Sequence, residues 1–114
     1  MTSNLKIDYI EFSSPKLEMT QDFFAKAFDW KFVEFGDNYR DIQNAGTGGG
    51  ISRTDGGISK APLIVLVSDD LAKALTQVKS AGGEITKEIF NFPGGKRFEF
   101  REPGGTEMAV WCKD

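Results

Sequence analysis

The stretch 97–111 constrains the fold more strongly than any other part of the chain. Charged residues alternate with Phe98 and Phe100 at its start, which is the period-two pattern of a strand with one apolar face. Pro103-Gly104-Gly105 then interrupts the run, because proline presets φ for a turn and glycine accepts a positive φ. The chain then returns with Met108, Val110 and Cys112 on one face and with Glu107, Ala109 and Trp111 on the other. The sequence therefore predicts a hairpin, with Phe98 and Phe100 packed under a helix.

The charge and hydropathy of the chain exclude two classes of partner. The net charge is −3 at pH 7, whereas a nucleic-acid face needs clustered lysine and arginine, so no nucleic-acid partner is expected. No segment is apolar over the length that spans a bilayer, and residues 1–6 lack the apolar core of a signal peptide. We therefore expect no membrane partner.

The cysteine and histidine content limits the possible chemistry. The single cysteine, Cys112, excludes an internal disulfide and predicts a reducing, cytoplasmic location. The chain has no histidine, which excludes Ser-His-Asp and Cys-His catalysis and the usual Cys/His zinc sites. Any metal ion would have to be held by carboxylates, amides or backbone oxygens.

The first half of the chain predicts a strand, a helix and three further strands. Residues 7–12 are rich in β-branched and aromatic residues, and Ser14 could then cap a helix whose first turn tolerates Pro15. Strands are expected at residues 30–35 and 39–43 and near 50–52. Apolar residues along the helix recur at a spacing that predicts one core-facing stripe; they are Met19, Phe23, Phe24, Ala27 and Phe28.

The middle of the chain is rich in glycine, at 46–50 and 55–57, and the second half then repeats the first. A phosphate-binding loop would need a helix start and usually a Lys-Ser/Thr pair after the glycines, and neither follows. A strand is expected at 62–67, and then a helix capped by Asp69 or Asp70 and stopped by Gly82-Gly83. A strand at 84–89 and the hairpin complete the chain.

The two halves share one order of elements, offset by roughly 53 residues, which is the signature of an internal repeat. We therefore predict an α+β fold of two tandem βαβββ units. The first covers about residues 5–54 and the second about 60–112, within a single domain spanning 1–114. Since each helix covers only one face of its small sheet, the two curved, mostly antiparallel sheets are expected to enclose a cleft.

Four short motifs resemble the vicinal oxygen chelate superfamily, which includes glyoxalase I, extradiol dioxygenases and the fosfomycin- and bleomycin-resistance proteins. They occur in the family's order over nearly the whole chain, and they are Phe23-Phe24-Ala25-Lys26-Ala27-Phe28-Asp29-Trp30, Val67-Ser68-Asp69-Asp70-Leu71, Ala81-Gly82-Gly83, and Arg97-Phe98 followed by Glu102-Pro103-Gly104-Gly105. The resemblance implies a glyoxalase-like fold, a small-molecule ligand and a homodimer.

The resemblance also implies where metal-dependent relatives hold their ion, on the first and last strand of each unit. The equivalent positions here are Tyr9, Leu63, Ala109 and either Gly49 or Gly50. Leucine, alanine and glycine carry no side-chain donor, and one phenol alone does not hold a divalent ion. The resemblance thus predicts no metal and no other cofactor. The alternative is a divalent ion such as Mg²⁺ or Mn²⁺ held by carboxylates alone, at Glu11, Glu99 and Glu107.

Strand parity predicts which side chains line the cleft. The same alternation that turns Tyr9, Leu63 and Ala109 inward adds their same-face neighbours, so the predicted ligand-binding residues are Tyr9, Glu11, Tyr39, Leu63, Val65, Arg97, Glu99, Glu107, Ala109 and Trp111. Aromatic area with a few placed charges suits a small-molecule pocket. The charged members could equally form solvated cross-strand ion pairs on an open sheet.

These observations favour one function and leave two others open. The favoured hypothesis is a metal-independent protein of the glyoxalase/bleomycin-resistance kind that binds an aromatic or polar metabolite or toxin in the cleft. The second is a lyase, isomerase or dioxygenase with a non-standard carboxylate site, in which Glu11 and Glu99 are the candidate catalytic residues because burial would raise a carboxyl pKa. The third is an accessory protein without a ligand.

Overall fold

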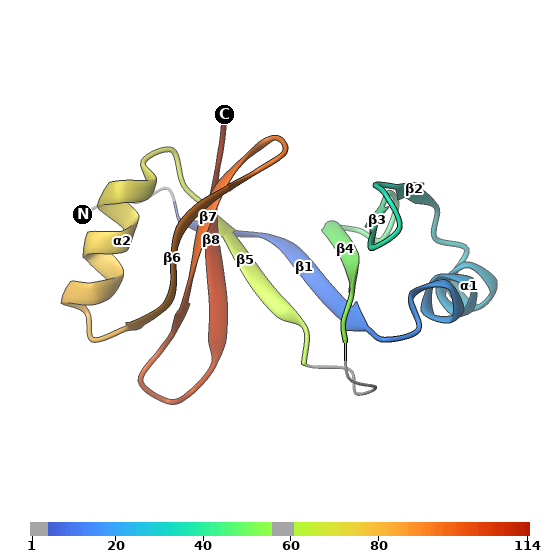
Figure 1. Ribbon diagram of the computed structural model, residues 1–114, viewed down its shortest axis with the longest axis horizontal. Coiled ribbons are helices and arrows are strands. Elements are labelled where there is room, and N and C mark those ends of the chain that lie inside the picture. The colour runs from blue at the N-terminus through green and yellow to red at the C-terminus, as the bar shows by residue number, and fades with distance from the viewer. Residues whose placement is uncertain (1–4, 56–60) are drawn as a thin grey trace. The chain divides into compact units, whose positions relative to one another are not determined.

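The computed structural model describes residues 5–55 and 61–114, which form two compact units. The N-terminal unit is Tyr9–Leu63, and the C-terminal unit combines Met1–Asp8 with Ile64–Asp114. Each unit has one helix and a small sheet (Figure 1). The first strand contributes to both units, because its residues up to Asp8 group with the C-terminal half of the chain.

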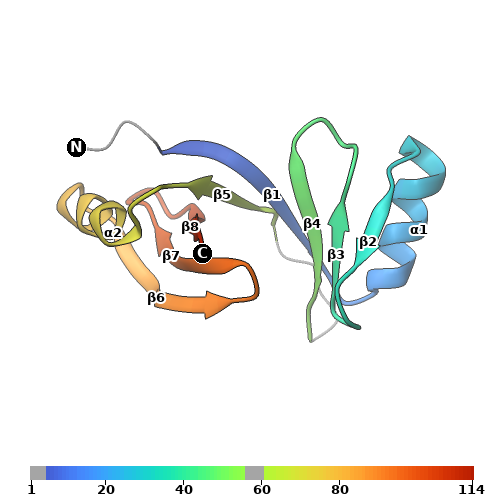
Figure 2. The same cartoon turned by 90° about the horizontal axis from the view of Figure 1, so that it is seen from above.

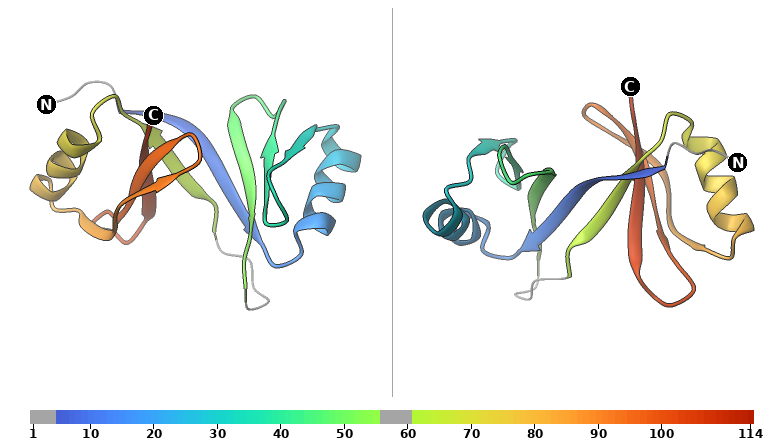
Figure 3. Two further views of the ribbon diagram at one scale, coloured as in Figure 1. Left: turned by 45° about the horizontal axis from the view of Figure 1, so that its top comes forward. Right: turned by 180° about the vertical axis from the view of Figure 1, so that it is seen from behind.

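The N-terminal unit has the strand order β2-β3-β4-β1. β1 runs parallel to β4, whereas the pairs β2–β3 and β3–β4 are antiparallel. Figures 2 and 3 show β3 and β4 side by side, as this pairing requires. The elements are β1 (Lys6–Ser14), α1 (Leu17–Phe28), β2 (Phe32–Glu34), β3 (Tyr39–Ile42) and β4 (Gly48–Arg53).

The C-terminal unit repeats this arrangement with the order β5-β8-β7-β6. β5 runs parallel to β8, and the pairs β7–β8 and β6–β7 are antiparallel. Its elements are β5 (Leu63–Val67), α2 (Leu71–Ser80), β6 (Glu84–Phe92), β7 (Gly95–Arg101) and β8 (Glu107–Lys113). The shared connectivity confirms the predicted α+β fold of two βαβββ repeats. No helix among the described residues has the length and apolar character to cross a membrane.

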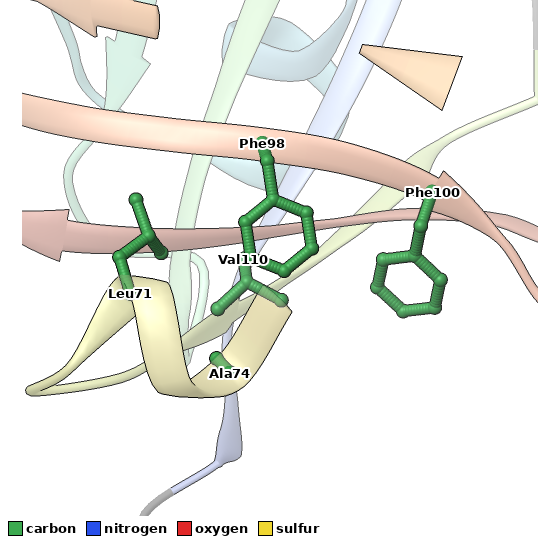
Figure 4. Close-up of a cluster of buried hydrophobic side chains, with 5 residues drawn as sticks. All are labelled: Leu71, Ala74, Phe98, Phe100 and Val110. Atoms are coloured by element: carbon green, nitrogen blue, oxygen red, sulfur yellow. The ribbon is translucent and has the colours of Figure 1, made fainter. Parts of the chain in front are cut away.

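The core of the C-terminal unit lies between α2 and the sheet, as predicted. Phe98 and Phe100 project from β7 toward α2 and are 0% and 7% exposed (Figure 4). They meet Leu71 and Ala74 of the helix and Val110 of β8. The hairpin holds this core in register, because Phe98 pairs with Val110 across β7 and β8. Because Phe98 is fully buried, truncating its side chain to alanine would cost about 3–5 kcal/mol of stability.

The two helices begin differently. The carboxylate of Asp70 caps α2 by accepting a hydrogen bond from the backbone N–H of Lys73 at 3.1 Å. At α1 the N-cap is Lys16, without a side-chain cap, so the prediction that Ser14 caps this helix is wrong. The Ser14 hydroxyl instead accepts from the Lys16 N–H at 3.0 Å and from the Thr20 hydroxyl at 2.7 Å.

The predicted core stripe of α1 is also wrong for most of its members. Leu17 is fully buried and Phe24 packs against the N-terminal core, but Met19, Phe23 and Phe28 are 65%, 60% and 52% exposed. Ala27 is exposed as well. The five apolar positions span more of the helix circumference than a small sheet can cover, so the sheet receives the side that begins at Leu17.

Candidate ligand-binding site

The glycine run of β4 forms the floor of a polar cluster in the N-terminal unit. Gly50 lies between two carboxylates, because its Cα pairs with that of Glu11 on β1 and with that of Asp41 on β3. Side chains alternate along a strand, so Tyr9 and Tyr39 share the face of the carboxylate two residues further on. Both strands therefore present a tyrosine and an acid on one side of the sheet.

The two tyrosine side chains cross above Gly50. Their hydroxyl oxygens are 2.7 Å apart. The Tyr9 hydroxyl also donates to Asp41 Oδ1 at 3.1 Å, and the Tyr39 hydroxyl donates to Glu11 Oε2 at 3.0 Å. Each phenol thus reaches the carboxylate on the other tyrosine's strand. The two phenols have only two protons for these three contacts. Oxygen lone pairs of the cluster therefore remain able to accept a hydrogen bond from a ligand.

The absence of a side chain at residue 50 is what allows this crossing. A Cβ atom at Gly50 would lie 2.2 Å from the Tyr39 hydroxyl oxygen and 2.3 Å from that of Tyr9. At Gly49 a Cβ atom would meet the backbone oxygen of Ile10 at 3.3 Å, so the tyrosines do not lie over that residue. Of the two glycines that the sequence left open, Gly50 is the one beneath the tyrosine pair.

Both phenols are neutral hydrogen-bond donors over the physiological pH range. Burial raises the pKa of Tyr9 above its ordinary value, and the charge of Asp41 adds to this effect while the hydrogen bond with Tyr39 opposes it. Burial also raises the pKa of Tyr39, and the charge of Glu11 raises it further. The cluster therefore has fixed donors and two acidic acceptors.

The corresponding face of the C-terminal sheet is apolar at its centre. Val65 on β5 pairs with Ala109 on β8, and both are buried, at 3% and 0% exposure. Ala109 in turn pairs with Glu99 on β7, whose carboxylate accepts from the Arg97 guanidinium at 2.8 Å. The guanidinium also lies 5.7 Å from the ring centre of Phe90. This pair joins residues of one strand rather than neighbouring strands.

Trp111 is oriented by a polar and an aromatic contact. It pairs with Arg97 across β7 and β8, next to the Glu99–Ala109 pair. Its indole N–H donates to Asp8 Oδ2 at 3.0 Å, and its ring lies 6.3 Å from that of Phe92. The indole therefore has a fixed orientation on the same face as the Arg97–Glu99 pair.

The structure brings most of the predicted residues into two groups. Tyr9, Glu11 and Tyr39 meet in the N-terminal unit, and the C-terminal face carries Val65, Arg97, Glu99, Ala109 and Trp111. Leu63 lies half-buried at the start of β5, and exposed Glu107 lies 3.8 Å from Arg101. The roles of all the predicted residues in ligand binding stay predictions, as does the cleft.

Two residues of the N-terminal cluster were missed, and Gly50 was named only as one of two possible metal-ligand positions. Asp41 and Gln43 follow Tyr39 at intervals of two, so strand parity alone places them on its face, and the Gln43 amide donates to the Asp41 carboxylate. Gly50 carries no chemical signal in the sequence. Only the strand pairing shows what lies above it.

A broad, open depression of about 590 Å³ lies at one end of the C-terminal sheet. It is lined by Val67, Ser68, Asp69, Trp111, Cys112 and Lys113. Trp111 is the one predicted ligand-binding residue among them. Because the depression is open, it would enclose little of a ligand's surface, whereas small-molecule sites usually cover most of it.

The sequence motifs and the repeated βαβββ fold agree with a family match. The model of the Glyoxalase/Bleomycin resistance protein/Dioxygenase superfamily matches residues 6–110. The chain belongs to this superfamily. No curated protein is a significant match to its sequence.

Solved structures of this superfamily share the fold at low sequence identity. The Mn(II)-bound glyoxalase from Novosphingobium aromaticivorans is 20% identical with a TM-score of 0.71, over 94% of this chain but only 38% of that one. Methylmalonyl-CoA epimerase from Mycobacterium tuberculosis is 13% identical with a TM-score of 0.73, over 100% of this chain and 92% of that one. A superfamily member from Vibrio splendidus 12B01 has the same identity and TM-score, over 96% and 99%. At these identities the likeness establishes the fold alone.

The residues of this superfamily member do not fit a divalent metal ion at the positions that the resemblance indicates. Gly50, Leu63 and Ala109 offer no side-chain donor, and the Tyr9 hydroxyl is engaged by Tyr39 and Asp41. Among the described residues there is no group of three or more acidic, cysteine or histidine side chains that could hold a metal ion.

Proposed function

We propose that this superfamily member binds a small organic molecule without a metal ion, and that the face carrying Tyr9 and Tyr39 contacts the ligand. The observation that carries the proposal is the crossing of the two phenols above Gly50. This crossing brings aromatic rings and acceptor oxygens together at Tyr9 and Gly50, two positions at which the resemblance would expect metal ligands. The single cysteine supports a cytoplasmic setting for this activity.

The chemistry of the cluster favours a ligand with an aromatic ring and an N–H or O–H donor. Tyrosine rings supply apolar contact area at low conformational cost. Glu11 and Asp41 each keep a second carboxylate oxygen with its own lone pairs, so they can accept from a ligand while they hold the tyrosines. A donor group on the ligand would also satisfy the lone pairs that the shared phenolic protons leave.

We propose that the C-terminal face is also able to contact a small molecule. Trp111 has the area to stack on a ring, and the Arg97–Glu99 pair offers both a donor and an acceptor. Buried Val65 and Ala109 give this face a smooth apolar centre. Leu63 and Glu107 complete the proposed binding set from the ends of their strands.

The metal-independence of binding is tested with Mn²⁺ as the probe. Isothermal titration of the purified chain with MnCl₂ is expected to show no saturable binding, and native mass spectrometry after dialysis is expected to show no metal adduct. One tightly bound equivalent of Mn²⁺ would overturn this part of the proposal. The same mass spectra report any organic molecule that the protein retains from expression.

The location of the site is tested with a panel of aromatic amines and phenols in a thermal-shift screen. Compounds that raise the melting temperature are expected to lose this effect in Tyr9→Phe and Tyr39→Phe. Thr76→Ala is the matched control, because it also removes one hydroxyl hydrogen bond, from Thr76 to the Ala72 carbonyl in α2. Hits that act equally on all three variants would refute the assignment.

The hydrogen bond between Tyr39 and Glu11 favours a second candidate function, acid–base catalysis. A carboxylate next to a phenol that stays protonated is a pair able to take up and return a proton. Methylmalonyl-CoA is a suitable probe, since an epimerase shares the fold. Exchange of its C2 hydrogen for deuterium is expected to disappear in Glu11→Gln. Exchange that survives in both Glu11→Gln and Glu99→Gln would exclude these catalytic residues.

A further inference from the structure

A charged side chain, that of Arg40, is buried on the side of the N-terminal sheet that α1 covers. Arg40 is 6% exposed and shares its face of β3 with Ile42, a residue of the N-terminal core. Tyr39 and Asp41 point to the opposite face, where the candidate site lies. Burying a guanidinium is costly unless its N–H groups are paired. The partners of Arg40 therefore show what this residue holds in place.

The Arg40 guanidinium bonds to both ends of the turn between β2 and β3. Its Nη1 donates to the Gly36 carbonyl at 3.1 Å and to the Tyr39 carbonyl at 2.9 Å. Its Nε donates to Gln21 Oε1 on α1 at 2.8 Å. The Tyr39 carbonyl also accepts from the Phe35 N–H at 3.0 Å, so the backbone and Arg40 close the turn together. Arg40 thus ties the backbone of Tyr39 to the helix.

Arg53, the last residue of β4, holds the middle of the same turn. Its Nη2 donates to the Asp37 carbonyl at 2.8 Å, and its Nε donates to the Asn38 side-chain oxygen at 3.2 Å. Its backbone N–H donates to the Asn38 carbonyl at 2.8 Å. Two arginines from neighbouring strands therefore bind successive residues of one turn.

Glu18, in the first turn of α1, links the two arginines. Its Oε2 lies 2.5 Å from Arg53 Nη2 and 3.6 Å from Arg40 Nη2. The hydrogen bond from Arg53 lowers the pKa of Glu18, so this carboxylate is charged at neutral pH. Arg40 Nη2 also lies 3.9 Å from Glu34 Oε2 on β2. The turn is thereby joined to α1 and to the strands on either side of it.

This turn leads directly into the candidate site. Tyr39 is the first residue of β3, so the turn and the pairing with Ser52 on β4 set the position of its backbone. Its hydroxyl meets those of Tyr9 at 2.7 Å and the Glu11 carboxylate at 3.0 Å. Because the phenol oxygen is at the far end of the side chain, a small rotation of the backbone moves it further than the backbone itself. A displacement of about 1 Å would break both contacts.

We propose that Arg40 and Arg53 are positioning residues for Tyr39. They hold the turn from the helix side of the sheet and thereby fix where the phenol stands on the other side. The role in binding rests on the proposed function, in which Tyr39 contacts the ligand, but the position of the phenol is measurable without any ligand. If the arginines were only structural, their loss would lower stability and leave the tyrosine environment unchanged.

The test is the alkaline titration of tyrosine absorbance at 295 nm on the full chain, with a urea titration of each variant. Arg40→Lys keeps the positive charge but lacks the planar set of donors that reaches two carbonyls and Gln21 together. Its phenols are expected to become more accessible to water, so tyrosinate absorbance rises at lower pH than in the wild type while the protein is still folded. Arg53→Lys, at a less buried side chain, repeats the test should Arg40→Lys fail to fold.

Ile42→Val is the matched control, because it removes buried contact from the same face of β3 and leaves the hydrogen bonds of the turn intact. Its titration curve is expected to match the wild type. Arginine variants whose curves overlay the wild-type curve, even at lower urea stability, would overturn the proposal. An equal shift in Ile42→Val would overturn it as well, because general loosening would then explain the effect.

Ligand binding separates this proposal from the proposed function. For aromatic amines or phenols that raise the melting temperature of the wild type, Arg40→Lys is expected to raise the dissociation constant about tenfold, as for one lost hydrogen bond. A shifted titration curve in a protein that binds none of these compounds would support the positioning role and count only against the proposed function.

Discussion

Replacing Gly50 with alanine tests the tyrosine crossing at its most sensitive point. The new methyl group would lie 2.2 Å and 2.3 Å from the two hydroxyl oxygens, well inside the 3.4 Å at which ordinary contact begins. Each hydroxyl must therefore retreat by about 1 Å. The rings stand over β4 from opposite sides, so they move apart and lose the 2.7 Å contact between them.

The expected cost follows from these contacts. Forcing one methyl group into a well-packed site destabilises a protein by about 1–3 kcal/mol, and each hydrogen bond lost adds about 0.5–1.5 kcal/mol. We expect Gly50→Ala to lower the free energy of unfolding by about 2–4 kcal/mol in a urea titration. Gly49→Ala is the matched control on the same strand. Its nearest contacts of 3.3 Å and 3.4 Å predict a smaller loss.

Alkaline titration followed by absorbance at 295 nm measures the ionisation of Tyr9 and Tyr39 directly, because the chain has only these two tyrosines. Burial raises both pKa values above the ordinary 10.0, so the folded state holds the phenolic protons more tightly than the unfolded state does. The stabilisation that comes from these raised pKa values is fully present below pH 10 and is lost as the pH rises above 10. We expect the wild-type tyrosines to ionise only as the protein unfolds.

In Gly50→Ala the displaced hydroxyls become more accessible to water, and tyrosinate absorbance is expected to rise at lower pH while the protein is still folded. In the Tyr39→Phe variant only Tyr9 remains to ionise, so its titration curve shows how much of the absorbance change Tyr9 contributes. A Gly50→Ala curve that overlays the wild-type curve, with unchanged urea stability, would refute the claim that this glycine holds the tyrosine pair.

Three further changes have expected outcomes. Phe98→Ala is expected to lower the free energy of unfolding by about 3–5 kcal/mol in urea, because the ring is fully buried. Asp70→Ala is expected to cost about 1 kcal/mol by thermal denaturation, whereas Lys16→Ala at the uncapped start of α1 changes little; equal losses would contradict the capping argument. The Glu102 carboxylate accepts hydrogen bonds from two backbone N–H groups of the hairpin turn, and these bonds lower its pKa. The stabilisation of the turn by this carboxylate is therefore present above the ordinary pKa of 4.5 and is lost at lower pH. A nuclear magnetic resonance titration of this side chain with a midpoint at or above 4.5 would contradict that assignment.

The predictions from sequence succeeded where a local pattern and its burial have one solution. In the hairpin from Gly95 to Lys113, Phe98 and Phe100 alternate with charged residues along β7, and only one face of that strand can meet α2. The turn needs a positive φ, which Gly105 adopts at 105°. Alternation, turn chemistry and helix coverage agree here, so the register follows.

The prediction failed at α1 because its apolar residues do not form one narrow stripe. A helix buries the side that the sheet can reach, and that choice depends on how the chain enters the helix. Ser14 and the uncapped Lys16 set this entry, and the buried side begins at Leu17. No count of apolar spacing could have distinguished that side from the side that Met19 and Phe23 occupy.

The sequence could predict which residues belong to the candidate site, but not which of their side chains meet. Tyr9, Glu11 and Tyr39 follow from parity along their own strands. Their meeting depends on β1 and β3 flanking β4 from opposite sides, which places Gly50 between them. This is a property of the sheet order, and a single sequence holds no direct record of it.

The hydrogen bond from Trp111 to Asp8 joins residues that are 103 positions apart. Leu5 likewise packs against the core of the unit that ends the chain. During synthesis on a ribosome, the contact between Asp8 and Trp111 cannot form until Trp111, 103 residues later, has been translated. The C-terminal unit therefore cannot complete its fold before Trp111 has been translated, and a fragment that begins at residue 61 would lack part of its own core.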